Sequence, residues 1–325
     1  MSLRQQLDLS ARYDAEYSHN LSSHLPMALT ALARLGARDA RLAAFAQRYA
    51  ARLRRAPAAE PWPGGEAWKS RLGDPRAWPA YRSLFNEWID HEGAPAVLAQ
   101  ALPALLRGVG AAAFHGPIRV AYALDAGHSN ELADALAYWA CRWFDLGELP
   151  AGGREHDPAP VLAALQIARP KRPLIAERMA LVAEQPAFMP AAASLQIDRE
   201  ATLARLAELA ARLYAASDNF TALHLVTSAH AMRVLLPWLE PEEQSTALGH
   251  YWLAYAAGHG ASGLNDSGRS TLPRAPLQAW PALIECALAS DDDHLIKLID
   301  SCRQQERAYG GAVWREAASR AVASA

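Results

Sequence analysis

Hydrophobic residues recur at helical spacing along almost the whole of this chain. Residues 199–213 (REATLARLAELAARL) and 131–144 (ELADALAYWACRWF) are clear examples, with apolar residues three and four positions apart. This spacing places the apolar side chains on one face of a helix. Alternation of apolar and polar residues, which is typical of half-buried strands, is almost absent. The pattern therefore predicts an all-α fold of roughly a dozen helices, given a usual helix length of about 11–12 residues with loops between.

Four stretches interrupt the helical pattern. They are residues 56–79, residues 145–160, part of residues 168–190, and residues 258–276. Loops this long in a compact helical domain are usually functional lids or disordered segments. None of them resembles an interdomain linker, because helical patterns of the same composition resume on both sides. We therefore expect residues 1–325 to form a single domain, in which helical hairpins pack around a central site.

The overall composition argues against several classes of partner and location. The chain has 32 basic and 34 acidic residues and a net charge of −2, which gives no long-range attraction to nucleic acid or to anionic membranes. Its three cysteines form no C-x-x-C pair, as suits a reducing compartment. The first residues (MSLRQQLDLSARYDAEY) lack the apolar core of a signal peptide, and no apolar run approaches the length of a membrane span. The expected location is the cytoplasm.

Four segments along the chain share one order of features. Each opens with a histidine in the first or second turn of a predicted helix, continues through an Ala- or Leu-rich helix and a polar turn, and ends in a second helix with a large aromatic residue. The histidines are His24, His115, His224 and His294, and the aromatic residues are Tyr49, Trp139, Trp252 and Trp314. If the four hairpins pack around one centre, the histidines converge there. Imidazole is a common ligand of iron, zinc, copper and nickel, so the arrangement predicts a metal site.

Each histidine also has a purely structural interpretation. His24 could hydrogen-bond at a helix start, and His115, before a Gly-Pro pair, could belong to a turn, so the metal hypothesis depends on the shared placement of all four. His230 follows His224 by six residues, about 120° around a helix, which makes the two poor co-ligands. His128 lies in a polar turn and is expected to be solvated. The remaining histidines carry no distinguishing pattern: His19, His91, His156, His250 and His259.

Lys297 lies three residues after His294 in the stretch DHLIKLID, so the two side chains share a face of a helix. The large aliphatic residues on both sides predict a helix that is buried nearly all round, which favours a buried lysine over a solvent-facing one. A desolvated lysine can be neutral, and a neutral amine can add carbon dioxide and become a carbamate, which is an anionic oxygen ligand. The alternative is an ordinary surface lysine. The aspartates 291–293 are interpreted as charges at a helix N-terminus rather than as ligands.

The stretches around these residues are similar to the questin oxidase-like family. The matching segments are SHLPM (23–27), FHGPIRVAY (114–122), ALHLVTS (222–228) and DDHLIK (292–297), in this order between residue 19 and about residue 300. The resemblance implies an all-helical oxidoreductase. Fungal members act in polyketide pathways by oxidative opening of anthraquinone-type rings, and they have been described both as NADPH-dependent Baeyer–Villiger oxidases and as non-haem iron oxygenases. Carried over by motif, the iron description assigns as metal ligands His24, His115, His224, His294 and Lys297, the last as a carboxylated lysine.

The sequence also bears on the cofactor, and it leaves alternative functions open. The chain has no G-x-G-x-x-G after a predicted strand and no flavin motif, so no dinucleotide site supports the use of NADPH. We expect an oxygenase that uses iron, or another divalent metal, and dioxygen on an aromatic or polyketide-like molecule. The alternative is a non-catalytic helical-repeat scaffold for a partner protein, which predicts scattered histidines and an exposed Lys297. A zinc hydrolase would keep the same site, but four imidazoles and a carbamate would nearly saturate zinc.

Overall fold

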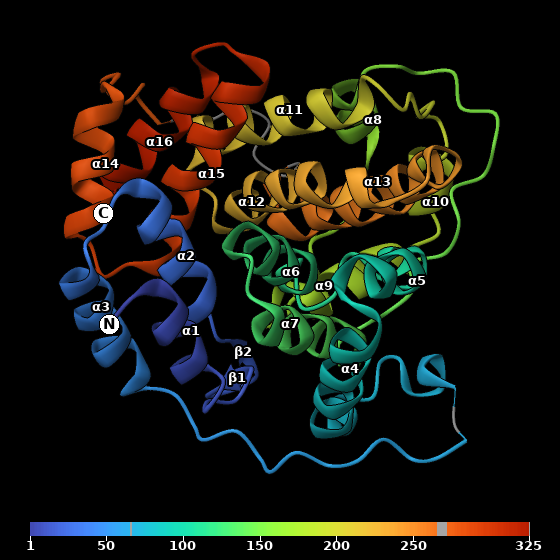
Figure 1. Ribbon diagram of the computed structural model, residues 1–325. Coiled ribbons are helices and arrows are strands. Elements are labelled where there is room, and N and C mark those ends of the chain that lie inside the picture. The colour runs from blue at the N-terminus through green and yellow to red at the C-terminus, as the bar shows by residue number, and fades with distance from the viewer. Residues whose placement is uncertain (66, 265–271, 325) are drawn as a thin grey trace.

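The computed structural model describes residues 1–65, 67–264 and 272–324, and it is built almost entirely of helices (Figure 1). The described part of the chain holds sixteen α-helices: α1 (Leu3–Ser10), α2 (Leu25–Leu35), α3 (Asp39–Ala50), α4 (Trp78–Glu92), α5 (Ala94–Arg107), α6 (His115–Ala126), α7 (Ser129–Cys141), α8 (Pro158–Ala164), α9 (Ile175–Ala183), α10 (Phe188–Ala192), α11 (Thr202–Ser217), α12 (Phe220–Leu235), α13 (Pro241–Ser262), α14 (Trp280–Ala289), α15 (Asp293–Tyr309) and α16 (Val313–Ser324). Strands β1 (Glu16–Tyr17) and β2 (Leu21–Ser22) form a small antiparallel hairpin. The predicted all-α fold is confirmed.

The four hairpins expected from the sequence are present. Helices α2 and α3, α6 and α7, α12 and α13, and α15 and α16 pack together in pairs. The aromatic residue of each second helix is buried in the core, and each indole N–H donates to a backbone carbonyl oxygen, so no polar atom of these rings is left without a partner. The three indoles donate to Gly108 for Trp139, to Ala192 for Trp252 and to Gly310 for Trp314.

The first helices of the four hairpins pack against one another in a closed order. Helix α2 contacts α6, α6 contacts α12, α12 contacts α15, and α15 contacts α2. Within one hairpin, a Cβ atom on Gly116 would lie 2.8 Å from the Trp139 ring, so only glycine lets α6 pack this closely on α7. The ring of helices α2, α6, α12 and α15 is the scaffold on which the site is built.

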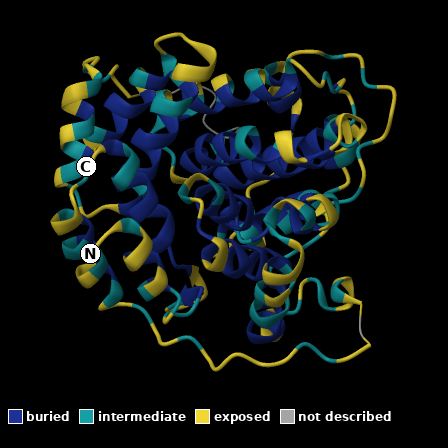
Figure 2. Cartoon of the chain, viewed as in Figure 1, coloured by how far each residue is buried: buried dark blue, intermediate teal, exposed yellow. Residues whose placement is uncertain are grey.

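The helices at the centre of the molecule are the most deeply buried. Helices near the centre of the molecule are dark blue in Figure 2, whereas outer helix faces and the long connection from α3 to α4 are exposed. Helix α12 is buried on almost every face, which explains why its sequence lacks a polar stripe. Residues from all parts of the chain contribute to one hydrophobic core.

The interrupted stretches agree with the structure in most places. In the described part of residues 56–79, the short 3-10 helices η1 (Trp68–Arg71) and η2 (Pro75–Ala77) are the only helices before α4 begins, and residues 145–157 form no helix. Helix α13 extends to Ser262, further into the stretch 258–276 than expected, and residues 265–271 lie outside the described residues. More helices occur than the expected dozen because short ones such as α8 and α10 lie within stretches of weak periodicity.

Candidate metal centre

The four histidines singled out from the sequence lie side by side at one end of the α2–α6–α12–α15 ring. Their ring centroids are 4.6 Å apart for His24 and His115, 5.0 Å for His115 and His224, 5.7 Å for His224 and His294, and 4.6 Å for His294 and His24. The side chains therefore close a four-membered ring in the same order as their helices. The Nε2 atoms of His24 and His115 are only 2.7 Å apart. The expected convergence is present, while a role as metal ligands stays a prediction.

All four histidines lie at the start of their helix: His24 is a cap residue, His115 and His294 lie in the first turn, and His224 lies at the beginning of the second turn. The Asn219 side chain caps α12 and the Asp292 side chain caps α15. His24 is itself the N-cap residue of α2, and its backbone N–H donates to Tyr49 Oη at 2.8 Å. The N-terminal ends of four helices thus meet at the histidines. Because these ends carry positive partial charge, the site favours neutral imidazoles and an anionic ligand.

His115 follows a strained piece of backbone. Ala112, Ala113 and Phe114 have φ angles of 48°, 56° and 70°, in the left-handed region, where each such residue is unfavourable by about 1–2 kcal/mol. Phe114 is fully buried and packs edge-on against Tyr251, with ring centroids 6.3 Å apart. This packing fixes the turn, since strained residues persist only where their surroundings impose them. Sequence periodicity does not reveal such a turn.

Hydrogen bonds at Nδ1 decide which nitrogen of two of the rings is free. Nδ1 of His115 lies 2.5 Å from the carbonyl oxygen of Ala112, and Nδ1 of His224 lies 2.8 Å from that of Phe220. A carbonyl oxygen accepts hydrogen bonds and cannot donate them, so Nδ1 carries the proton in both rings. Nε2 then keeps its lone pair, which is the form in which imidazole binds a metal.

Asp293 offers a carboxylate oxygen to Nδ1 of each of the other two rings. Its Oδ1 lies 2.9 Å from His294 Nδ1, and its Oδ2 lies 3.1 Å from His24 Nδ1. Burial alone would raise the pKa of this carboxyl, but the facing His24 and His294 rings hold it below its ordinary value, so Asp293 is ionised. One ligand atom from each of these three residues lies within 4.8 Å of the others, so the carboxylate could also reach a cation. Sequence reasoning correctly placed Asp293 at the start of a helix but missed this contact.

Replacing Asp293 by asparagine is expected to lower the affinity for a metal by about tenfold. An amide offers one acceptor oxygen and one donor NH2 group, so it can serve only one of the two Nδ1–H groups, and loss of such supporting contacts typically weakens metal binding by about 10–100-fold. The matched control is Asp292→Asn, because asparagine caps a helix as well as aspartate does. Titration with a competing chelator measures both. Equal affinities for Asp293→Asn and the parent would show that the carboxylate does not support the rings.

Lys297 is buried, with 2% of its surface exposed, and its Nζ lies 3.0 Å from His24 Nδ1. Burial lowers its pKa to about 8, against the attraction of Asp293 and Asp292. Lys297 thus contacts the same nitrogen of His24 as Asp293 does, and it is not among the residues that line the cavity onto which the four histidines open. An ammonium here competes with Asp293 for His24 Nδ1. If the Lys297 nitrogen is neutral or carbamylated, His24 can keep its proton on Nδ1 and donate it to Asp293. Nε2 of His24 then keeps its lone pair.

The donor set fits a metal ion. Two ligand nitrogens bound at about 2.1 Å and at right angles lie about 3 Å apart, close to the separation of the His24 and His115 Nε2 atoms. His294 Nε2 is buried and has no hydrogen-bond partner among the described residues. Burial lowers the pKa of His24 to about 3, and it also lowers the pKa values of His115 and His224, so these rings are neutral and available as ligands.

One family model matches most of the chain. The family model described as questin oxidase-like matches residues 19–302, which includes all four histidines and Lys297. The chain belongs to the questin oxidase-like family. Membership places the protein among oxidoreductases. No protein of curated function matches the chain. None of the helices in the described ranges combines the length and apolar composition that crossing a membrane requires.

In this questin oxidase-like protein, the histidines form one wall of a cavity of about 460 Å³. The rest of the lining is mostly apolar, with Glu16, Arg142 and Glu177 as its charged residues, and it comes largely from the β1–β2 hairpin, the residues before α6 and the start of α9. Leu21 and Phe220 are large hydrophobic residues that remain exposed at this cavity, with 45% and 55% of their surfaces accessible. The Phe220 ring contacts those of His224 and His294, at centroid distances of 4.9 and 4.8 Å. Such a cavity suits a flat apolar molecule.

Neither His230 nor His128 lines this cavity. His230 is buried on α12, accepts from Arg233 at 3.2 Å and lies 3.7 Å from Asp125, as expected for a residue that is no co-ligand. The expectation that His128 is solvated is wrong: it is buried, its Nδ1 accepts from the Glu131 N–H, and it caps α7. The sequence shows only that His128 lies in a polar turn, and not that α1 packs over it, with Asp8 Oδ1 3.0 Å from His128 Nε2.

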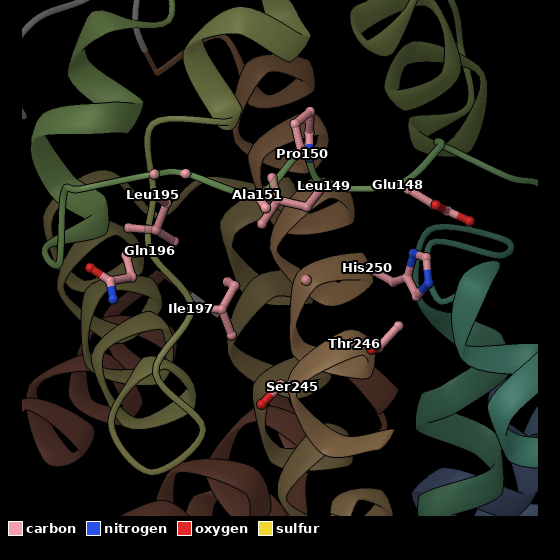
Figure 3. A pocket seen from close by; sticks show the side chains of 13 residues that line it. Glu148, Leu149, Pro150, Ala151, Leu195, Gln196, Ile197, Ser245, Thr246 and His250 are labelled. Carbon is pink, nitrogen blue, oxygen red and sulfur yellow. The ribbon is translucent and has the colours of Figure 1, made fainter. Parts of the chain in front are cut away.

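A second cavity, of about 520 Å³, shares no lining residue with the first. It lies between the segment 148–153, the segment 195–197 and α13, with Glu148 and His250 at one end and Leu195 and Gln196 at the other (Figure 3). The four histidines line the first cavity and none of them lines the second.

Proposed function

We propose that the protein is a metal-dependent oxygenase that oxidises an aromatic or polyketide-like small molecule with dioxygen, in a Baeyer–Villiger-type or ring-opening reaction. Non-haem iron would be held by His24, His115, His224, His294 and a carbamylated Lys297. The observation that carries the proposal is the closed ring of imidazoles. The Nδ1 atoms of His115, His224 and His294 face acceptors, and that of His24 faces Asp293 and Lys297, so Nε2 can serve a metal in each ring once Lys297 no longer donates to His24. Iron tolerates six ligands and keeps room for one more, whereas zinc prefers four.

Each part of the site has a task in this proposal. Bound iron supplies the redox chemistry that dioxygen requires. Asp293 and the backbone carbonyls of residues 112 and 220 keep the imidazoles oriented and in one tautomer. The apolar cavity walls exclude water from the reacting molecule, and the exposed rings and aliphatics at its edge, Phe220 and Leu21, offer a surface on which a planar substrate packs.

Carbamylation of Lys297 removes a conflict within the site. An ammonium beside a divalent metal would be repelled by it and would also lack solvation. The neutral amine instead forms a nitrogen–carbon bond to carbon dioxide, one carbon–oxygen π bond breaks, and the displaced nitrogen proton goes to water. The product is an anion that reaches about two bonds further than the amine. The pKa of about 8 keeps a fraction of Lys297 neutral near physiological pH, as this addition requires.

The scaffold alternative predicts scattered histidines and an exposed Lys297. The four rings are instead adjacent, and Lys297 is 2% exposed. These two observations favour the oxygenase. We also propose a cytoplasmic location, because Cys141, Cys286 and Cys302 are all free thiols.

Metal analysis of the protein purified without chelators tests this function. We expect about one iron per chain, or uptake of iron by the metal-free protein, and consumption of dioxygen in the presence of a hydroquinone or anthrone-like substrate without added flavin. Removal of the metal with a chelator should abolish that consumption, and re-addition of iron should restore it. Parallel reactions with and without NADPH determine whether a nicotinamide reductant is also needed. A protein that neither contains nor takes up metal would contradict the oxygenase and favour the scaffold.

A further inference from the structure

The residues directly before His115 have an unusual backbone. Ala112, Ala113 and Phe114 are three consecutive residues with positive φ. Residues other than glycine adopt this conformation as single residues and rarely in a run. The other non-glycine residues with positive φ in the described ranges are isolated from one another: Ser18, Asn20 and Asp218. The segment 112–114, here called the left-handed turn, is thus set apart from the rest of the backbone.

The left-handed turn lies in the site and touches one of its rings. Ala112 and Ala113 line the cavity, although neither side chain has a reactive group. Their contribution is made by the backbone: the Ala112 carbonyl oxygen accepts both from His115 Nδ1 at 2.5 Å and from the His115 N–H at 3.3 Å. One carbonyl thereby orients the ring and the start of α6 together.

The turn is held in place by Phe114, which is anchored in the core. Its side chain is fully buried against Tyr251, and a Cβ atom added to Gly258 would lie 3.3 Å from Phe114 Cε2. Helix α13 therefore has space for this ring because residue 258 is glycine. The alanines, in contrast, have no side-chain reason to be left-handed. The strain in them is maintained by the packing of the third residue.

We propose that the left-handed turn is a positioning device for His115: Phe114 imposes a strained backbone on Ala112 and Ala113, and this backbone keeps the proton on Nδ1 and directs Nε2 towards His24. The proposal rests on the proposed function only where it concerns metal affinity. The tautomer and direction of His115 can be measured in the metal-free protein. Phe114 and the two alanines are positioning residues, since none of them is proposed to touch the metal.

The test is Phe114→Leu, which shortens the anchor. In metal-free protein labelled with ¹⁵N-histidine, NMR of the ring nitrogens should report a single Nδ1–H tautomer of His115 in the parent and a mixture in Phe114→Leu, with a metal affinity about tenfold lower. The control is Phe85→Leu, because Phe85 is equally buried but belongs to α4 and packs among Tyr81 and Trp88. The control should retain the single tautomer and the parent affinity.

A rescue separates positioning from general packing. Glycine adopts positive φ without strain, so Phe114→Leu combined with Ala112→Gly should return His115 towards the single tautomer, although the cavity left by the shorter side chain remains. Retention of one tautomer in Phe114→Leu, or failure of Ala112→Gly to restore it, would overturn the proposal. If the parent binds no metal, the proposed function fails while the tautomer result still decides the role of the turn.

A second measurement covers the case in which Phe114→Leu does not fold. Ala112→Gly alone should raise the midpoint of thermal unfolding, because it relieves a strained position, whereas Ala111→Gly, at a buried residue without positive φ, should lower it. A lower midpoint for Ala112→Gly would show that the turn stores no strain, and the proposal would then be wrong.

Discussion

Replacing His224 by glutamine is expected to weaken metal binding by at least about a hundredfold, or about 2.8 kcal/mol at 1.4 kcal/mol per tenfold change. The His224 ring lies between those of His115 and His294, and its Nδ1 is bound to the Phe220 carbonyl, so its Nε2 has no other assigned role. Glutamine has similar polarity but lacks an imidazole nitrogen. The affinity is measured by competition with a chelator of known strength.

His230 provides the control for this substitution. It lies on the same helix and is equally buried, but its partners are Arg233 and Asp125. His230→Gln should therefore leave the metal affinity unchanged within about twofold, even if the stability of the fold decreases through loss of these contacts. Equal losses of affinity in the two variants would mean that metal binding reports only the integrity of α12, and the four-histidine site would be wrong.

Lys297→Ala is expected to lower the metal affinity by about a hundredfold when carbon dioxide is present. The substitution removes the carbamate, which is the one anionic ligand in the proposed set, while the four imidazoles stay in place. A short carboxylic acid such as acetate should recover part of the affinity, because it can occupy the space of the lost side chain and supply an anionic oxygen. Lys297→Arg should not recover it, since arginine remains charged and does not form a carbamate under these conditions.

Carbon dioxide provides the decisive comparison. Removal of bicarbonate should weaken metal binding by the parent and leave Lys297→Ala unaffected, and ¹³C-labelled bicarbonate should give a carbamate signal only in proteins with Lys297. A Lys297→Ala variant that binds metal as tightly as the parent would show that this lysine is a buried structural residue. The histidine site could then still exist, with Asp293 as its anionic group.

The candidate site could be recognised early because its residues are tied to local positions. A histidine near the start of a helix lies towards the end of the helical layer whatever the helix packs against, and four such positions recur in the same order of features. The burial of Lys297 likewise follows from the aliphatic residues around it, since a helix that is apolar on nearly every face has to be buried. These conclusions depend on neighbours within one or two helical turns.

The contacts of Asp293 could not be predicted from neighbouring residues in the sequence. Its place at the start of α15 predicts a favourable helix charge, and that interpretation is compatible with the structure. Its two oxygens nevertheless contact His24 and His294, one near the start of the chain and the other on its own helix. Only the packing of α2 on α15 brings His24 there. The burial of His128 under α1 was missed for the same reason.

The amino-acid sequence by itself determined that the protein is helical, that its helices form hairpins, that four histidines lie near the starts of four helices, and that Lys297 lies in an apolar stretch, because hydrophobic periodicity and helix starts are local properties. The tertiary structure alone decided the closed order of α2, α6, α12 and α15, the tautomers of the rings and the left-handed turn before His115. Those features depend on contacts between segments far apart in the chain, which override the backbone preference of residues such as Ala112 and Ala113.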